Sequence, residues 1–205
     1  MSVSLQKGQK ISLKKSDGSG LKKVMVGLGW DEAQQTARGL RALFAAKPQD
    51  IDCDASVILC GADGKLLSKT INQTCVYYNN LRHPSGAVVH QGDNLTGGGE
   101  GDDEQIMVDL SLLPAEVSKL VFVVNIYDAN VRNQHFGMIR NAFIRLVDLS
   151  TRNEICRFNL TEDYSGKTGM VVGEIYKHGG EWKFNAIGQG VVDASRITKL
   201  LEMYQ

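Results

Sequence analysis

The chain has 205 residues, of which 42% are hydrophobic and 22% are charged, so it can form one large domain or two small ones and does not have the composition of a disordered chain. Lys and Arg together number 23, as do Asp and Glu, and this balance argues against a globally basic protein that binds nucleic acid directly. No stretch reaches the roughly 18 apolar residues of a membrane span. The first residues lack the apolar core of a signal peptide, so we expect a cytoplasmic protein without a transmembrane segment.

The first half of the chain combines one predicted helix with one predicted strand. Residues 31–47 place apolar side chains at helical spacing, with Asp31 as the N-cap, which predicts a helical insertion over residues 31–48. Residues 51–59 then alternate between apolar and polar types, which is typical of a strand. An Asp-Gly pair at 63–64 predicts a turn after this strand.

The second half is dominated by strand patterns. Residues 119–127 are apolar on both predicted faces, which favours a strand inside a sandwich. Further strands are expected at 142–149, 154–160, 169–176 and 181–187. Short helices are expected at 132–140 and within residues 191–205, the latter because apolar residues recur at helical spacing.

These elements together predict a mainly β protein. We expect a two-sheet β-sandwich with a few short peripheral helices, built as a single domain over residues 1–205. The absence of internal repeats and of a Pro-rich linker favours one domain over two.

The four cysteines show no Cys-x-x-Cys pair and no zinc-finger spacing; they are Cys53, Cys60, Cys75 and Cys156. Each lies in an apolar, strand-like run, so we expect buried thiols that act as small hydrophobic side chains. A redox or metalloid-reactive thiol is the alternative.

An acidic, glycine-rich segment runs from Gly92 to Glu104. It contains no Lys or Arg. Its five carboxylates are those of Asp93, Glu100, Asp102, Asp103 and Glu104. Crowded negative charges repel one another, so a folded loop of this kind needs a countercharge. Glycines let the backbone turn its carbonyl oxygens inward, and carboxylate and carbonyl oxygens together are the ligands that calcium prefers. The segment therefore predicts a calcium site, with a solvated acidic loop as the alternative.

The architecture of such a site differs from that of an EF-hand. Leu95 and Gly97 stand where an EF-hand requires side-chain oxygens, and no predicted helix flanks the segment.

Asp52 and Asp54 lie two apart in a predicted strand, so their side chains leave the same face. They either contribute ligands to an ion bound by the acidic segment or cap the end of the strand that faces the solvent. Asp128 is a weaker candidate of the same kind, with a plain turn residue as the alternative.

Several motifs in this order resemble the TerD family of bacterial tellurite-resistance and stress proteins. They are found at Val26–Trp30, Asp52–Ser56, Gly92–Glu104, Phe122–Ala129, Asn141–Arg145, Leu160–Asp163 and Gly180–Phe184. The resemblance covers about Val3 to Gly190. It implies a calcium-binding β-sandwich without catalytic activity that works with protein partners of a stress-resistance complex, including membrane-associated ones.

The resemblance also implies a set of metal ligands. It supports Asp93, Asn94, Asp102, Asp103 and Glu104 as calcium ligands, with Asp52 and Asp54 as contributors. Backbone oxygens of the glycine run, at Gly99 and Gly101, would complete the shells, and the number of carboxylates suggests two ions. The predicted helical insertion at 31–47 is longer than the loop expected between the first two motifs.

The leading hypothesis is a calcium-binding, non-enzymatic stress-response protein in which the ion orders the acidic loop and so forms a surface for a partner. A metal-dependent phosphoester hydrolase that uses the same acidic cluster is the alternative. Direct handling of metalloids by thiols is a third hypothesis.

Overall fold

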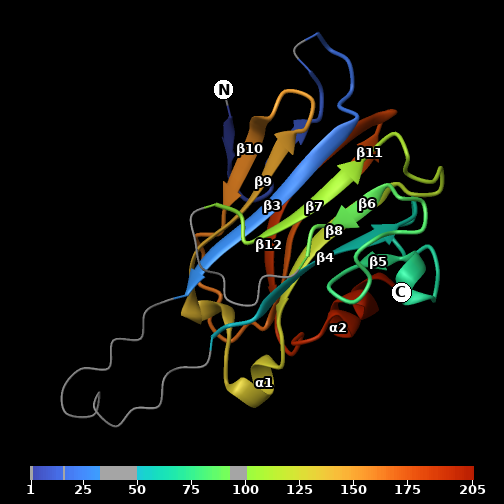
Figure 1. Cartoon of the computed structure of the whole chain (residues 1–205). Coiled ribbons are helices and arrows are strands. Elements are labelled where there is room, and N and C mark those ends of the chain that lie inside the picture. Colours follow the sequence, from blue (N-terminus) through green and yellow to red (C-terminus); the bar gives the residue numbers. More distant parts are fainter. Residues whose placement is uncertain (1, 16, 33–49, 93–100) are drawn as a thin grey trace, which may run out of the picture.

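The computed structural model describes residues 2–15, 17–32, 50–92 and 101–205, and within these ranges the chain forms two six-stranded sheets (Figure 1). The first sheet has the order β1 (Val3–Leu5), β10 (Asn153–Asn159), β9 (Ile139–Asp148), β3 (Lys23–Glu32), β7 (Glu104–Asp109) and β6 (Val88–His90). The second sheet has the order β2 (Lys10–Ser12), β12 (Glu181–Val191), β11 (Gly169–His178), β8 (Lys119–Ile126), β4 (Cys53–Cys60) and β5 (Cys75–Val76). The predicted mainly β, two-sheet sandwich is confirmed.

Among the residues that the structure describes, the helical elements are short and lie outside the sheets. They are α1 (Ala129–Arg132), α2 (Ile197–Leu201) and the 3-10 turns η2 (Ile71–Gln73), η3 (Phe136–Met138) and η4 (Glu202–Tyr204). No helix among the residues described here is long and apolar enough to cross a membrane.

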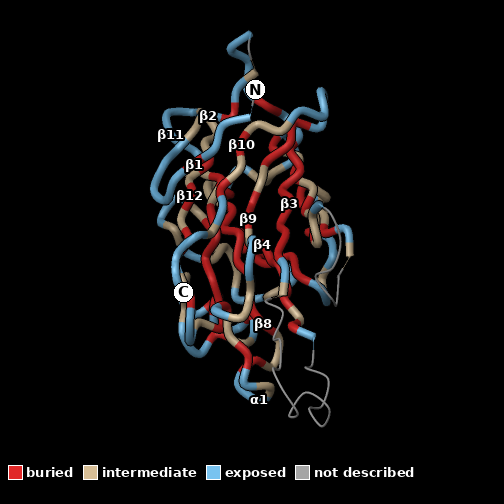
Figure 2. Tube along the Cα trace, turned by 90° about the vertical axis from the view of Figure 1, so that its left-hand side faces the viewer, coloured by how far each residue is buried: buried red, intermediate tan, exposed pale blue. Residues whose placement is uncertain are grey.

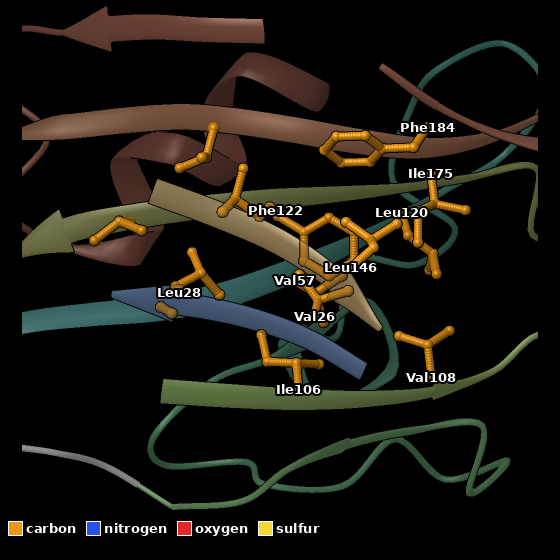
Figure 3. Packing of buried hydrophobic residues seen from close by; sticks show 14 of the residues in the cluster. Val26, Leu28, Val57, Ile106, Val108, Leu120, Phe122, Leu146, Ile175 and Phe184 are labelled. Carbon is orange, nitrogen blue, oxygen red and sulfur yellow. The ribbon is translucent and has the colours of Figure 1, made fainter. Parts of the chain in front are cut away.

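The main core fills the space between the sheets. Phe122 and Phe184 from the second sheet and Val26 and Leu146 from the first are all fully buried (Figure 3). Figure 2 shows the buried stretches running along the middle of the strands, with exposed segments at the turns. Burial of these apolar side chains is the main favourable contribution to the stability of the sandwich.

A second apolar cluster lies on the outer face of the second sheet. Val121 and Val123 of β8 pack there against Leu200 and Leu201 of α2. This helix explains why β8 is buried on both faces, as its sequence predicts. The predicted C-terminal helix is confirmed in shorter form, because β12 continues to Val191 and α2 begins only at Ile197.

Two helix predictions need correction. Asp31 is not a helix N-cap, because β3 continues to Glu32 and pairs Asp31 with Arg140 of β9. The remainder of the predicted insertion, residues 33–47, lies outside the described residues. The predicted helix at 132–140 is not continuous, because α1 ends at Arg132 and only the 3-10 turn η3 (Phe136–Met138) lies inside this range. Asn133 adopts a left-handed φ of 53° that ends α1, and strand pairing has begun again by Ile139.

The four cysteines are buried and free, as predicted. Burial raises the pKa of the Cys60 and Cys156 thiols to about 12, and it raises the pKa of Cys75 further. Thiols with such pKa values form little thiolate at neutral pH, and the thiolate is the reactive form.

Candidate carboxylate site at one end of the sandwich

One end of the sandwich gathers the candidate ligands that the structure describes. Leu28, near the end of β3, stands opposite Glu104 at the start of β7 in the first sheet. Cys53, at the start of β4, stands opposite Ile126 at the end of β8 in the second. The Glu104 carboxylate joins the two sheets here, because its Oε2 accepts a hydrogen bond of 2.6 Å from the Ala55 backbone N–H.

Glu104 lies between the sheets. Its side chain is 1% exposed, and alternate residues of β7 from Glu104 onward are buried. The His90 Nε2 atom lies 3.4 Å from Glu104 Oε2 and 3.2 Å from the Ala55 carbonyl oxygen. A carboxylate this deep in the protein needs compensating partners, since transfer of a charge from water is costly.

Asp102 lies on the outer face of the first sheet. Gly27 stands between Gln105 and Arg145 in the register of three adjacent strands. Asp102 accepts hydrogen bonds from Arg145 Nε at 2.6 Å and Nη2 at 2.9 Å, and one from Gln105 Nε2 at 3.1 Å. Its side chain is 0% exposed. A bidentate arginine–carboxylate pair is strong and geometrically specific, so Arg145 holds Asp102, and with it the C-terminal end of the acidic segment, in place.

The absence of a side chain at Gly27 makes this arrangement possible. A Cβ atom at position 27 would lie 2.3 Å from the carboxyl carbon of Asp102. At Gly29, two residues further on, an added Cβ atom would lie 2.4 Å from the Phe143 ring and 2.8 Å from the carbonyl oxygen of Gly101. The glycines of β3 therefore leave room for the end of the acidic segment on the surface of the sheet.

Asp103 connects the same segment to the end of β3. Its N–H donates to the Leu28 carbonyl at 2.8 Å, and its Oδ2 accepts from the Trp30 N–H at 2.7 Å. Burial raises the pKa of Asp103, and the neighbouring carboxylates of Asp31 and Asp102 raise it further. A raised pKa means that the ionised form of this carboxyl group is disfavoured when no cation is bound.

Asp52 and Asp54 approach from the second sheet, on its outer face. Asp54 is buried, and its Oδ2 accepts a hydrogen bond of 3.1 Å from the Asn125 side chain. Asp52 Oδ2 lies 3.7 Å from Arg132 Nη1 of α1. The predicted common direction of the two aspartates fits the strand, because the intervening Cys53 belongs to the core between the sheets.

The Cys53 thiol shows that these carboxylates act together electrostatically. Burial raises its pKa well above the usual value, and Glu104, Asp54, Asp52 and Glu32 each raise it further, in that order. Glu32 of β3, Asp54 of β4, Asp52 directly before β4 and Glu104 of β7 thus contribute a negative potential at one buried point. Such a potential favours a cation, and the donors are hard oxygens of the type that calcium binds. The described donors therefore fit a calcium ion in chemical type.

The predicted ligand set is brought to one end of the molecule but onto different surfaces. Asp102 is on the outer face of the first sheet, Glu104 is between the sheets, and Asp52 and Asp54 are on the outer face of the second. Within the described ranges, no three His, Cys, Asp or Glu side chains form a group that could hold a metal ion. Three predicted ligands, Asp93, Asn94 and Gly99, lie outside the described residues.

Asp128, the weaker candidate, belongs to a turn. It has a left-handed φ of 50° directly before α1, and its Oδ1 pairs with Arg196 at 2.5 Å. Two arginines that the sequence did not predict, Arg145 and Arg132, pair with predicted ligands. A buried carboxylate indicates that a cation is near, but Arg145 is 43 residues from Asp102 in the sequence, and only the strand register brings them together.

The fold and this end of the molecule define a mainly β, two-sheet protein with several carboxylates at one end of the sandwich, on different surfaces of the sheets. The family model of the TerD domain matches residues 1–204. Stress response protein SCP2 of Bacillus subtilis (strain 168) is 48% identical over 204 residues, with 100% of both chains covered. Tellurium resistance protein TerD of Serratia marcescens is 46% identical over 190 residues, which cover 93% of this chain and 91% of that protein. The chain therefore belongs to the TerD family of tellurium-resistance and stress-response proteins.

A solved structure supports the fold assignment. The crystal structure of a homologue of telluride resistance protein (TerD) from Streptomyces coelicolor A3(2) superposes with a TM-score of 0.63, covering 91% of this chain and 99% of that one. Its sequence identity is 20%, so the likeness concerns the fold alone.

Proposed function

We propose that this TerD-family protein is a calcium-binding, non-enzymatic stress-response protein of the tellurite-resistance type. In this proposal, calcium neutralises the carboxylates at one end of the sandwich and orders the acidic segment, which then forms a surface for a partner. The partners would be proteins of a stress-resistance complex, membrane-associated ones included. A cytoplasmic location is part of the proposal, and the four free cysteines are consistent with a reducing compartment.

The observation that carries the calcium proposal is that carboxylates of both sheets meet near the start of β4, where the buried Glu104 accepts a hydrogen bond from the Ala55 N–H, next to the buried Asp54. These carboxylates also raise the pKa of the buried Cys53 thiol, which agrees with a concentration of negative charge there. A concentration of one sign of charge in a partly buried region is costly in the protein alone, and a bound divalent cation would offset it.

The ligands would come from both sheets and from the acidic segment. Asp103 and Glu104 on the β7 side, and Asp52 and Asp54 on the β4 side, are the described side chains best placed to contribute. Asp93, Asn94, Gly99 and Gly101 remain in the proposed set, for two ions. Asp102 would contribute least, because an ion would have to compete with a bidentate guanidinium for its oxygens.

Chemistry at the cysteines is a weaker explanation of the family's link to tellurium. All four thiols are buried, and the pKa of every one of them is raised. A thiol that reacts with a metalloid needs exposure and thiolate character, and this environment opposes both.

Thermal unfolding of chelator-stripped protein tests the proposal. A ligand present at about one hundred times its Kd stabilises the folded state by roughly 2.7 kcal/mol. We therefore expect a clear rise in Tm with calcium, a smaller rise with magnesium, and loss of the calcium effect in Asp103→Asn combined with Glu104→Gln. Glu162→Gln is a matched control, because Glu162 pairs with Lys7 on an exposed surface. A Tm that does not change when calcium is returned would contradict the proposal.

A further inference from the structure

The short helix α1 is attached to the chain that enters β4. The Tyr127 N–H donates to the Asp52 carbonyl at 2.8 Å, and the Gln134 side chain donates to the Asp50 carbonyl at 3.2 Å. Tyr127 and Gln134 lie on either side of α1, so the helix and residues 50–52 are held together at both ends of α1. Figures 1 and 2 both place α1 at the extreme end of the sandwich.

The last residue of α1, Arg132, faces one of the proposed ligands. Its Nη1 lies 3.7 Å from Asp52 Oδ2, and its guanidinium lies 5.5 Å from the centre of the Tyr127 ring. The two charged side chains are 21% and 17% exposed, so solvent screens them only in part. The ring holds the guanidinium in place by a cation–π contact while leaving its charge directed at Asp52.

Arg196 provides a natural comparison on the same ring. Its guanidinium lies 5.2 Å from the centre of the Tyr127 ring, but it pairs with Asp128, which is outside the proposed ligand set. Two arginines thus share one aromatic partner, and of the two only Arg132 has an ion pair with a proposed ligand among the described contacts.

We propose that Arg132 is a built-in counter-ion for Asp52 that competes with calcium and thereby couples calcium binding to α1. This inference rests on the proposed calcium-binding function. The ion pair is longer than a hydrogen bond, so the guanidinium can yield to a cation of higher charge at the same carboxylate. A tethered cation lowers the affinity of the site, because binding of the metal ion must offset the lost pair.

The direction of the effect separates competition from structural damage. Removing a competing charge tightens calcium binding, whereas distorting the site weakens it. Thermodynamic linkage makes the coupling reciprocal. If calcium favours the state in which Arg132 has left Asp52 by a given factor, calcium binds that state more tightly by the same factor.

Calorimetric titration of chelator-stripped protein with calcium tests this inference. Arg132→Gln should lower the Kd about threefold at low salt, the size expected for loss of a partly exposed ion pair. Arg132→Lys, which keeps the charge, should stay close to wild type. Arg196→Gln, the matched control, should leave the Kd unchanged. The gain in Arg132→Gln should shrink as salt is raised.

A second set of variants guards against misfolding. Arg132→Met keeps the apolar part of the side chain against Tyr127 while removing the charge, and it should also tighten binding. In an Asp52→Asn background, Arg132→Gln should no longer change the Kd, because the pair is already broken. An unchanged or raised Kd in both Arg132→Gln and Arg132→Met, with wild type binding normally, would overturn the inference and leave the calcium proposal standing. Failure of wild type to bind calcium would overturn both.

Discussion

Two carboxylate–arginine pairs stand at the same end of the sandwich and differ in geometry. Asp102 is held by Arg145 through two hydrogen bonds, of 2.6 and 2.9 Å, and its side chain is fully buried. Asp52 lies 3.7 Å from Arg132, and both side chains keep some exposure. The first pair builds the surface on which the acidic segment ends. The second pair is longer and less buried. Geometry therefore separates two pairs that are identical in residue type.

The largest expected effect is on the tight pair. Arg145→Gln leaves the Asp102 carboxylate buried without its guanidinium, and we expect a loss of about 3 kcal/mol in the free energy of unfolding, at the lower end for broken buried pairs. Denaturant unfolding of the variant measures it. Arg140→Gln changes an exposed arginine on the same strand and should cost little. Equal stability of the two variants would show that the Asp102–Arg145 pair is not structural.

The next effect concerns the surface beneath Asp102. Gly27→Ala places a Cβ atom 2.3 Å from the Asp102 carboxyl carbon, and overpacking of this kind should cost about 2 kcal/mol of unfolding free energy. Gly20→Ala is the control, since a Cβ there meets nothing within 4 Å. If both alanine variants unfold at the same denaturant concentration, the close approach of Asp102 to β3 is incorrect.

The smallest stability effect belongs to the loose pair. Arg132→Gln should change the free energy of unfolding in the absence of calcium by less than about 1 kcal/mol, because the pair is long and partly solvated. Denaturant unfolding of Arg132→Gln and Arg145→Gln under the same conditions measures the difference between the two pairs. A loss as large as that of Arg145→Gln would make Arg132 a second structural clamp and remove the difference between the two pairs.

Much of the fold could be predicted because its signals are local. The apolar run of β8, the turn-separated strands β9–β10 and β11–β12, and the apolar spacing of α2 are all visible in short windows of sequence. The error at Asp31 arose because a distant strand determines the local structure there. Asp31 suits a helix N-cap, but pairing of β3 with β9 extends the strand through it.

The candidate site was predictable in composition and not in arrangement. The excess of carboxylates around residue 102 can be read directly from the sequence, and so can the common face of Asp52 and Asp54. The positions of Asp102 and Glu104 on opposite surfaces of the first sheet depend on how Gly27, Gln105 and Arg145 line up across three strands. That register is a property of the folded protein, so neither arginine partner could be assigned in advance.

Calorimetric titration of the chelator-stripped wild-type protein with calcium decides whether the carboxylates at this end of the sandwich bind the ion. We expect saturable binding, with a stoichiometry of two ions if the carboxylates from both sheets and the acidic segment all take part. A titration that shows only the heat of dilution, on protein whose fold is verified by its unfolding transition, would contradict it.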